Sequence, residues 1–224
     1  MITVHHLENS RSQRVLWLLE ELGLQYRVKR YPRDKETGLA PAALRKVHPL
    51  GKSPVITDEG LTVAESGAII EYLVGAYGRD SGLLPAEGTP ARLQYSYWLH
   101  YAEGSAMPPL LLSLIFRKMP EAPMPFFVRP VVRGIADKVQ KTFVRPQLAL
   151  HFDFMEAELG KHEWFAGPEF TAADIQMSFP VEAAGAAGLL GETRPRLLAF
   201  IERIASRPAY QRALKKGGPY TLGF

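Results

Sequence analysis

The chain has 224 residues, of which 46% are hydrophobic and 22% are charged, a composition typical of globular proteins. The 27 Lys and Arg residues exceed the 23 Asp and Glu residues by four, which suits a small anionic ligand but not nucleic-acid binding. No apolar run approaches the roughly 18 residues of a membrane span, and residues 1–9 lack a signal-peptide pattern. We therefore expect a cytoplasmic protein of one large or two small domains that binds neither nucleic acid nor membrane.

Cysteine is absent, which excludes disulfides, cysteine-bound zinc and a cysteine nucleophile. Any thiol chemistry must therefore use a thiol that a ligand supplies. His5 and His6 are adjacent in a strand-like segment, so their side chains should point to opposite faces. No metal-binding motif occurs, and we expect no metal.

The first eighty residues alternate between strand and helix patterns. Alternating apolar residues predict strands over residues 3–7, 26–31, 54–57 and 61–64, and helical spacing predicts helices over 15–22, 40–47 and 69–77. Gly23 and Gly78 should end the first and the last of these helices. The order βαβαββα predicts a small α/β domain with a mixed sheet over residues 1–79.

A linker rich in Gly and Pro over residues 79–90 leads to a part without strand patterns. Thr89 and Pro90 are a good N-cap and first residue for its first helix. Helices are predicted over 91–117, 135–159, 172–184, 195–205 and 208–215, with the proline-rich stretch 118–130 separating the first two. Residues 90–224 should therefore form an all-α domain.

Two serines precede predicted helices and have a local structural interpretation. Ser10 and Gln13 have the spacing of a capping box. Ser66 would cap the helix that follows it, where the carboxylate of Glu65 would favour the helix dipole. Both serines should therefore lie at helix N-termini, whether or not they also bind a ligand.

Four segments together carry a family resemblance: SRSQRV at residues 10–15, GKSPV at 51–55, ESGAI at 65–69 and FTAADI at 170–175. In this order and spacing they resemble the signatures of glutathione transferases, and the resemblance covers nearly the whole chain. The first segment is most similar to a serine-type subgroup from bacteria and fungi. The resemblance implies a thioredoxin-like N-terminal domain, a helical C-terminal domain and a homodimer.

The resemblance also implies that a hydroxyl near residue 10 donates a hydrogen bond to the sulfur of glutathione. A free thiol has a pKa of about 8.5, so lowering it by about two units requires roughly 2.7 kcal/mol of thiolate stabilisation. Ser10 is the first candidate, and Ser12 and Asn9 remain alternatives. Arg11 could also favour the thiolate, or it could be a solvated arginine.

Other matched positions would hold the rest of glutathione. A cis Ser53–Pro54 bond would turn the Ser53 backbone toward the cysteinyl residue, whereas a trans proline would simply begin an edge strand. Ser66 and the helix N-terminus would bind the γ-glutamyl carboxylate, and Glu65 would pair with the ammonium group. Lys52 would bind the glycyl carboxylate, although an exposed loop lysine is the commoner situation.

The implied reaction is conjugation of glutathione, used as a co-substrate, to a hydrophobic electrophile. Apolar candidates for the acceptor pocket are Trp98, Tyr101, Met107, Pro108 and Phe116, each of which is more typical of a core or dimer interface. Glutathione-dependent peroxide reduction is an alternative reaction. A non-catalytic binding module with the same fold is an alternative class of protein.

A ladder of basic residues follows the proline-rich stretch. Arg129, Arg133, Lys141 and Arg145 are spaced at multiples of four, and Asp137 interrupts them. Most such ladders form a solvated helix face, and a minority guide anionic substrates.

Overall fold

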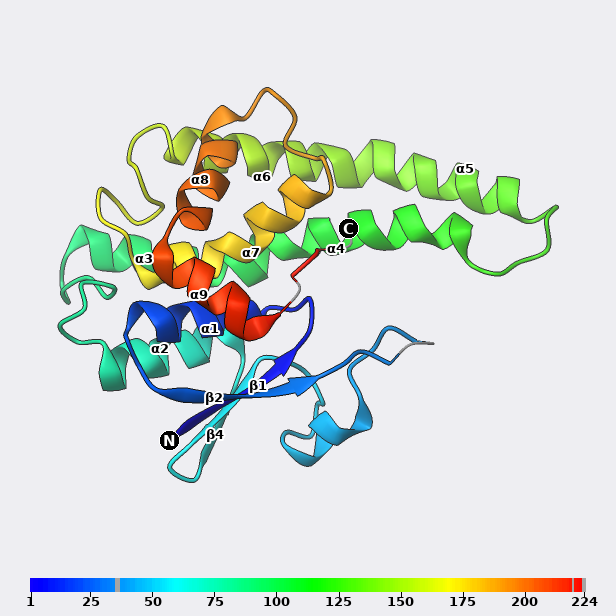
Figure 1. Cartoon of the computed structure of the whole chain (residues 1–224). Helices are drawn as coiled ribbons and strands as arrows, with labels where there is room; N and C mark the ends of the chain where they lie inside the picture. The colour runs from blue at the N-terminus through cyan, green and yellow to red at the C-terminus, as the bar shows by residue number, and fades with distance from the viewer. Residues whose placement is uncertain (35–36, 219, 223–224) are drawn as a thin grey trace.

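A computed structural model describes residues 1–34, 37–218 and 220–222 of the chain. It contains an N-terminal α/β layer and a larger group of helices that lies over one face of that layer (Figure 1). Among these described residues, no helix has the length and apolar character needed to cross a membrane.

The sheet has four strands: β1 (Ile2–Leu7), β2 (Tyr26–Tyr31), β3 (Val55–Asp58) and β4 (Leu61–Ala64). Their order is β2-β1-β3-β4, with β1 parallel to β2 and the other neighbours antiparallel. The helical crossover between β1 and β2 makes that pair parallel, and a tight turn with Gly60 at φ +87° makes β3 and β4 a hairpin. The mixed sheet and the thioredoxin-like fold are therefore confirmed.

Helices α1 (Ser12–Glu21) and α2 (Ser66–Tyr77) cover one face of the sheet (Figure 1). Both begin three residues before the predicted starts. In α1 this is because the first turn holds polar residues, Ser12 and Arg14, that are nevertheless buried. The predicted helix over 40–47 is a short 3₁₀ helix (Ala42–Lys46).

The helical domain contains α3 (Pro90–Tyr101), α4 (Met107–Lys118), α5 (Arg129–Val139), α6 (Arg145–Glu158), α7 (Ala172–Ala186), α8 (Pro195–Ala205) and α9 (Pro208–Gly217). Thr89 caps α3 as predicted, since its hydroxyl accepts the Arg92 N–H at 3.2 Å. The two long helices differ from the prediction, because π-helical segments (Ala102–Ala106 and Gln140–Val144) interrupt them.

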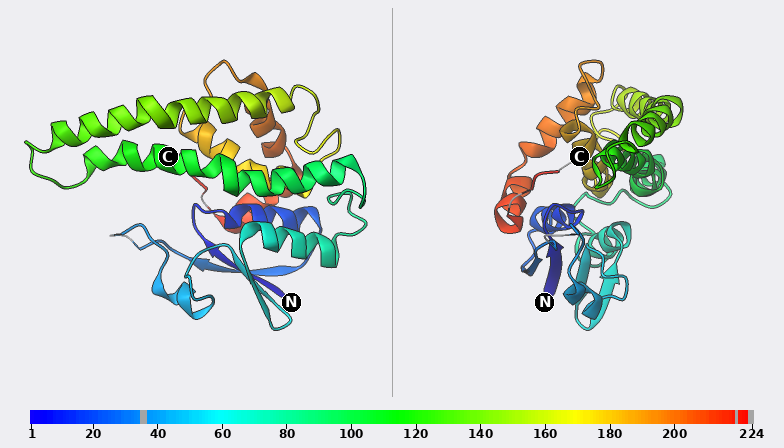
Figure 2. Two further views of the ribbon diagram at one scale, coloured as in Figure 1. Left: turned by 180° about the vertical axis from the view of Figure 1, so that it is seen from behind. Right: turned by 90° about the vertical axis from the view of Figure 1, so that its right-hand side faces the viewer.

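The predicted break over 118–130 is shorter than expected. A 3₁₀ turn (Met119–Glu121) follows α4, and α5 already begins at Arg129 rather than at residue 135. Helices α4 and α5 therefore form a long hairpin that projects beyond the rest of the helical domain (Figures 1 and 2).

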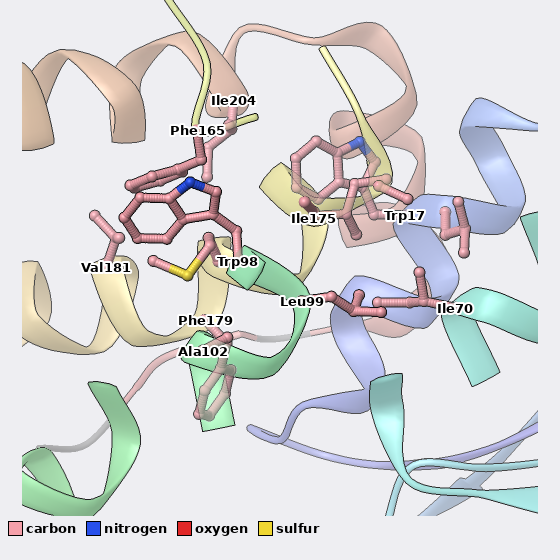
Figure 3. Close-up of a cluster of buried hydrophobic side chains, with 14 of the residues drawn as sticks. Trp17, Ile70, Trp98, Leu99, Ala102, Phe165, Ile175, Phe179, Val181 and Ile204 are labelled. Carbon is pink, nitrogen blue, oxygen red and sulfur yellow. The ribbon is translucent and has the colours of Figure 1, made fainter. Parts of the chain in front are cut away.

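One continuous core joins the sheet, α1 and α2 to the helical domain. Trp17 of α1 and Ile70 of α2 lie in the same cluster as Trp98 of α3 and Phe179 of α7 (Figure 3). Trp98, Tyr101 and Met107 are buried in this core, so they do not line an open acceptor pocket. The two domains consequently share buried surface and should unfold together.

Candidate functional site

Three serine hydroxyls converge on Leu7, the last residue of β1. Ser10 donates a hydrogen bond to the Leu7 carbonyl at 2.7 Å, and Ser12 Oγ lies 2.8 Å from Ser10 Oγ and 3.2 Å from the same carbonyl. The Ser53 hydroxyl donates to the His5 carbonyl at 2.9 Å and accepts the Leu7 N–H at 3.3 Å. The structure thus brings residues from two separate motifs, Ser10, Ser12 and Ser53, to the end of one strand.

His6 extends this network inward. Its Nδ1 lies 2.8 Å from Ser12 Oγ, and the ring is 3% exposed. Burial and the nearby charge of Arg30 lower the pKa of His6 to about 4, although a hydrogen bond to the Gly217 backbone works in the opposite direction. His6 is therefore neutral at physiological pH, and it holds Ser12 away from the surface. His5 points to the other face, where its Nδ1 lies 3.0 Å from the Tyr31 hydroxyl, as expected for adjacent strand residues.

The start of α1 differs from the predicted capping box. Arg11 occupies the N-cap position without a side-chain cap, and both polar atoms of the Gln13 amide are buried without a partner among the described residues. Ser10 Oγ instead accepts the Ser12 N–H at 3.2 Å. The capping box fails because Gln13 points toward Gly217, where a Cβ would meet its Oε1 at 2.3 Å.

Arg14 links the start of α2 to the helical domain. This buried guanidinium donates to Ser66 Oγ at 2.8 Å and to the Gln176 carbonyl at 2.5 Å, and it forms an ion pair with Glu103. Burial lowers the pKa of Arg14, and Glu103 opposes that shift. Because Arg14 donates to Ser66 Oγ, the hydroxyl proton of Ser66 remains available to a ligand.

Glu103 lies in the first π-helical segment and binds both arginines that follow Ser10. Arg11 Nε lies 2.8 Å from Glu103 Oε1 and 3.0 Å from Oε2, and the Arg11 guanidinium lies 4.8 Å from the centre of the Phe179 ring. Burial alone would raise the pKa of Glu103, but Arg14 and Arg11 hold it below its ordinary value. Arg11 is therefore a compensated charge, not a free cation beside Ser10.

The start of α2 also corrects a prediction. Glu65, not Ser66, occupies the N-cap position, with φ +69° and no side-chain cap. Left-handed backbone at a non-glycine residue costs of the order of 1–3 kcal/mol and is concentrated at functional sites. Ser66 is the first residue of α2, so its hydroxyl lies beside the free N–H groups of the helix N-terminus.

The Ser53–Pro54 peptide bond is cis, as the resemblance implied. Ser53 uses its hydroxyl to extend the pairing with β1, and within the described residues its backbone N–H and C=O form no hydrogen bond. Lys52 and Glu65 are exposed, and neither forms an ion pair within the described part of the chain. Backbone N–H and C=O groups that are free in this way can pair with a peptide ligand.

The C-terminal segment forms a hydrogen bond with the side chain of Asn9. The Oδ1 of Asn9 accepts the Thr221 N–H at 2.7 Å, and the backbone of Asn9 has φ +49°. The neighbouring Tyr220 donates to Glu182 at 3.0 Å, and Tyr210 donates to the same carboxylate. Burial raises the pKa of Glu182 to about 7, against the effect of the two hydroxyls and Arg14.

Taken together, these groups favour a peptide-like anionic ligand. Two hydroxyls lie at or beside helix N-termini, where the dipole favours negative charge, and an unpaired stretch of backbone lies near one of them. The described residues contain no group of three or more His, Asp or Glu side chains suited to hold a metal ion.

Sequence reasoning missed His6 in this network, Glu103 and Gln176. His6 carried a signal, since it precedes Ser12 by six residues in the same strand–helix unit. Glu103 and Gln176 carried none, because their contacts to Arg11 and Arg14 depend on how the helical domain packs against α1.

Two family descriptions match the chain. "Glutathione S-transferase, N-terminal domain" matches residues 10–75, and "Glutathione S-transferase, C-terminal domain" matches residues 119–208. Among similar sequences, Glutathione S-transferase 3 of Schizosaccharomyces pombe is 38% identical over 99% of this chain and 90% of its own length. Glutathione S-transferase 1 of Saccharomyces cerevisiae is 34% identical over 96% of this chain and 95% of its own length.

Solved structures with the same fold include a glutathione S-transferase from Actinobacillus pleuropneumoniae. Its TM-score is 0.81 at 33% identity, over 100% of this chain and 95% of the other. A glutathione transferase from Phanerochaete chrysosporium, solved in complex with oxidised glutathione, has a TM-score of 0.76 at 23% identity over 96% of both chains, a likeness of fold alone.

Proposed function

Since the chain belongs to the glutathione S-transferase family, we propose that it binds glutathione, stabilises its thiolate and conjugates it to a hydrophobic electrophile in the cytoplasm. The observation that carries this proposal is the convergence of Ser10 and Ser53 on Leu7. One hydroxyl and one free stretch of backbone meet there, which are the groups needed to hold a cysteinyl residue. Glutathione then acts as the co-substrate that supplies the thiol the chain lacks.

Ser10 is the group that we assign to the sulfur. Its hydroxyl donates to the Leu7 carbonyl, and it needs only to rotate to donate to a thiolate. A hydrogen bond to an anion is stronger than one to a neutral carbonyl, so the thiolate should compete successfully. Ser12 is fully buried and bonded to His6, and the Asn9 amide oxygen is engaged by Thr221, which makes both weaker candidates.

The charged ends of glutathione would be held by exposed or helix-terminal groups. Ser66, oriented by Arg14, would donate to the γ-glutamyl carboxylate beside the N-terminus of α2. Glu65 would pair with the ammonium group, and Lys52 with the glycyl carboxylate. Arg11 would contribute through its ion pair with Glu103, by fixing the loop that carries Ser10.

A pH titration of bound glutathione tests the assignment, because the thiolate absorbs in the ultraviolet. Ser10→Ala should raise the pKa of the bound thiol by one unit or more, since one unit corresponds to about 1.4 kcal/mol. Ser12→Ala and Asn9→Ala are the matched controls and should move that pKa much less. Conjugation of an aromatic halide should slow in parallel for Ser10→Ala.

The opposite pattern would contradict the assignment. If Ser10→Ala titrates like the wild type while Asn9→Ala or Ser12→Ala shifts the thiol pKa, another residue contacts sulfur. If the wild type binds glutathione but turns over neither an aromatic halide nor a peroxide, the chain is a binding module and the proposed reaction is wrong.

We further propose that the protein is a homodimer whose contacts involve the two long helical runs. Their exposed apolar side chains recur at helical spacing: Leu93, Tyr97, Leu111, Ile115, Val131, Ile135, Phe143 and Leu150. Light scattering at micromolar concentration should give twice the chain mass of 25.0 kDa. A mass of one chain would refute the dimer.

A further inference from the structure

The turn between α4 and α5 forms the outer end of the long hairpin (Figures 1 and 2). We name residues 119–128, which connect the two helices, the hairpin tip. These ten residues include three prolines, two phenylalanines and two methionines, and Glu121 is their one charged residue. The hairpin tip is therefore largely apolar, although it projects beyond the rest of the helical domain.

Two aromatic residues of the hairpin tip are largely exposed to solvent. Phe126 is 85% exposed and Phe127 is 67% exposed, and Phe126 has the largest exposed fraction among the large hydrophobic residues in the described part of the chain. The two rings lie edge to face with their centres 5.6 Å apart. Neither ring packs against the hydrophobic core. The fold does not use these side chains, so they are available to an apolar partner.

Exposed basic residues flank the hairpin tip on both helices: Arg117, Lys118, Arg129 and Arg133. None of the four forms an ion pair within the described residues. Glu121 is the one acidic residue between them, so residues 117–133 have a net charge of +3, out of +4 for the whole chain. The apolar tip is therefore surrounded by most of the net positive charge of the molecule.

Helix stability explains only two of these four basic residues. The C-terminus of a helix favours cations, which accounts for Arg117 and Lys118 at the end of α4. The N-terminus of a helix disfavours cations, yet Arg129 is the first residue of α5 and Arg133 lies one turn later. The position of these two arginines therefore points to an anionic partner outside the hairpin.

The size and charge of the hairpin tip distinguish between possible partners. A phenylalanine side chain buries about 150–250 Å², whereas a stable protein interface buries about 800 Å² on each partner. A second copy of the tip would bring the same positive charge, and like charges repel. A lipid surface needs no large matching area, and it offers an apolar interior beneath anionic head groups.

We propose that the hairpin tip attaches the protein reversibly to the surface of a bilayer that contains anionic lipids. Phe126 and Phe127 enter the head-group region, and the flanking basic residues contact the lipid phosphates. The expectation that the chain does not bind membrane rested on the absence of a membrane-spanning run, and attachment to a bilayer surface needs no such run.

Sedimentation with vesicles tests the proposal in the full-length protein without glutathione. We expect the wild type to sediment with vesicles of equal parts phosphatidylcholine and phosphatidylglycerol, and much less with phosphatidylcholine alone. Phe126→Ser with Phe127→Ser should lower the partition coefficient by about tenfold or more, because the apolar contribution is lost. Leu61→Ser with Leu198→Ser, at exposed leucines of β4 and α8, is the matched control and should leave the partition coefficient unchanged.

A second pair of variants tests the basic residues. Arg129→Gln with Arg133→Gln should weaken binding to the mixed vesicles by about tenfold, since each cation near an anionic surface contributes separately. Lys138→Gln with Lys141→Gln removes the same charge farther from the hairpin tip and should weaken binding less. Equal weakening by these two double variants would reduce the effect to general surface charge and overturn the proposal.

Fluorescence quenching by lipids brominated on their acyl chains locates the contact. The three native tryptophans, Trp17, Trp98 and Trp164, are buried, so vesicles of these lipids should quench the wild type little. Phe126→Trp places a fourth tryptophan at the hairpin tip, and its emission should be quenched strongly. Absence of this additional quenching would overturn the proposal.

Three further results would also overturn it. The first is failure of the wild type to sediment with the mixed vesicles. The second is binding at the wild-type level by Phe126→Ser with Phe127→Ser, in a protein that unfolds at the wild-type temperature. The third is a monomeric mass for this double variant by light scattering beside a dimeric wild type, which would assign the hairpin tip to the dimer interface. None of these measurements depends on the proposed reaction.

Discussion

Ser10 and Ser66 both lie at or beside the start of a helix, yet they are held in opposite ways. The partners of Ser10 are Leu7 and Ser12, two or three residues away. The partners of Ser66 are Arg14 and Gln176, which are 52 and 110 residues away. The Ser10 hydroxyl is therefore positioned by local chain geometry, and the Ser66 hydroxyl is positioned by the packing of the two domains.

Removing Arg14 should therefore have the largest effect, and it acts on the region around Ser66. Arg14→Met leaves the Glu103 carboxylate with Arg11 alone and removes the shorter of the two hydrogen bonds that Ser66 Oγ accepts. Breaking a fully buried ion pair costs about 3–5 kcal/mol, and because Glu103 is partly exposed and keeps Arg11, the free energy of unfolding in urea should fall by less than that amount. Arg27→Met, at an exposed arginine of β2, is the control and should change it little.

A double substitution sharpens this prediction. Arg14→Met combined with Glu103→Leu removes both charges of the ion pair, and it should regain part of the lost stability. If the double variant is as unstable as the sum of the single ones, the ion pair is not what links the two domains.

Low pH should lower the stability of the region around Ser10 through His6, which contacts Ser12. Its pKa is about 4 in the folded protein and about 6.5 in the unfolded chain, so between these values only the unfolded chain takes up the proton. His6 therefore makes its full contribution to the free energy of unfolding above pH 6.5, and this contribution is lost as the pH falls toward 4. The loss should reach about 2–3 kcal/mol at pH 4.5.

Comparison of variants isolates the histidine from the carboxylates that also titrate in acid. His6→Asn should lose less stability than the wild type between pH 7 and pH 4.5, and His162→Asn, at an exposed position, should behave like the wild type. If the free energy of unfolding falls equally with pH in all three proteins, His6 takes up its proton in the folded protein as easily as in the unfolded chain.

The smallest expected effect separates the two serines by their role toward glutathione. Ser66→Ala should weaken glutathione binding by about 1–3 kcal/mol and leave the pKa of the bound thiol unchanged, because it loses only the contact to the carboxylate. Ser10→Ala should raise the pKa of the bound thiol and leave the affinity for glutathione nearly unchanged. Calorimetry measures the affinity for glutathione, and ultraviolet titration measures the pKa of the bound thiol. A shift of that pKa in Ser66→Ala would show that the two serines do not have separate roles.

The same division explains what the sequence could predict. β2 and β4 have the predicted bounds, because alternating residues and nearby turn residues determine them. The strand–helix order, the thioredoxin-like fold and the cis Ser53–Pro54 bond were also confirmed. Each of these features follows from neighbouring residues or from a short matched motif.

The errors occurred where distant residues decide the local structure. The capping role of Ser66 was wrong because Glu65 occupies the N-cap position and Ser66, whose hydroxyl accepts from Arg14, is the first residue of α2. The predicted helix over 91–117 missed the π-helical segment that carries Glu103. Periodicity also placed the start of α1 too late, since it counts Ser12 and Arg14 as surface residues although both are buried.

Arg14 finally bears on how such a chain can diversify. Its side chain belongs to α1, yet its partners lie on α2, on the π-helical segment and on α7. A hybrid gene that joined this N-terminal domain to the helical domain of a relative would have to supply a matching carboxylate and carbonyl at those places. Recombination between relatives is therefore constrained by this one guanidinium, and the two domains should be inherited as a pair.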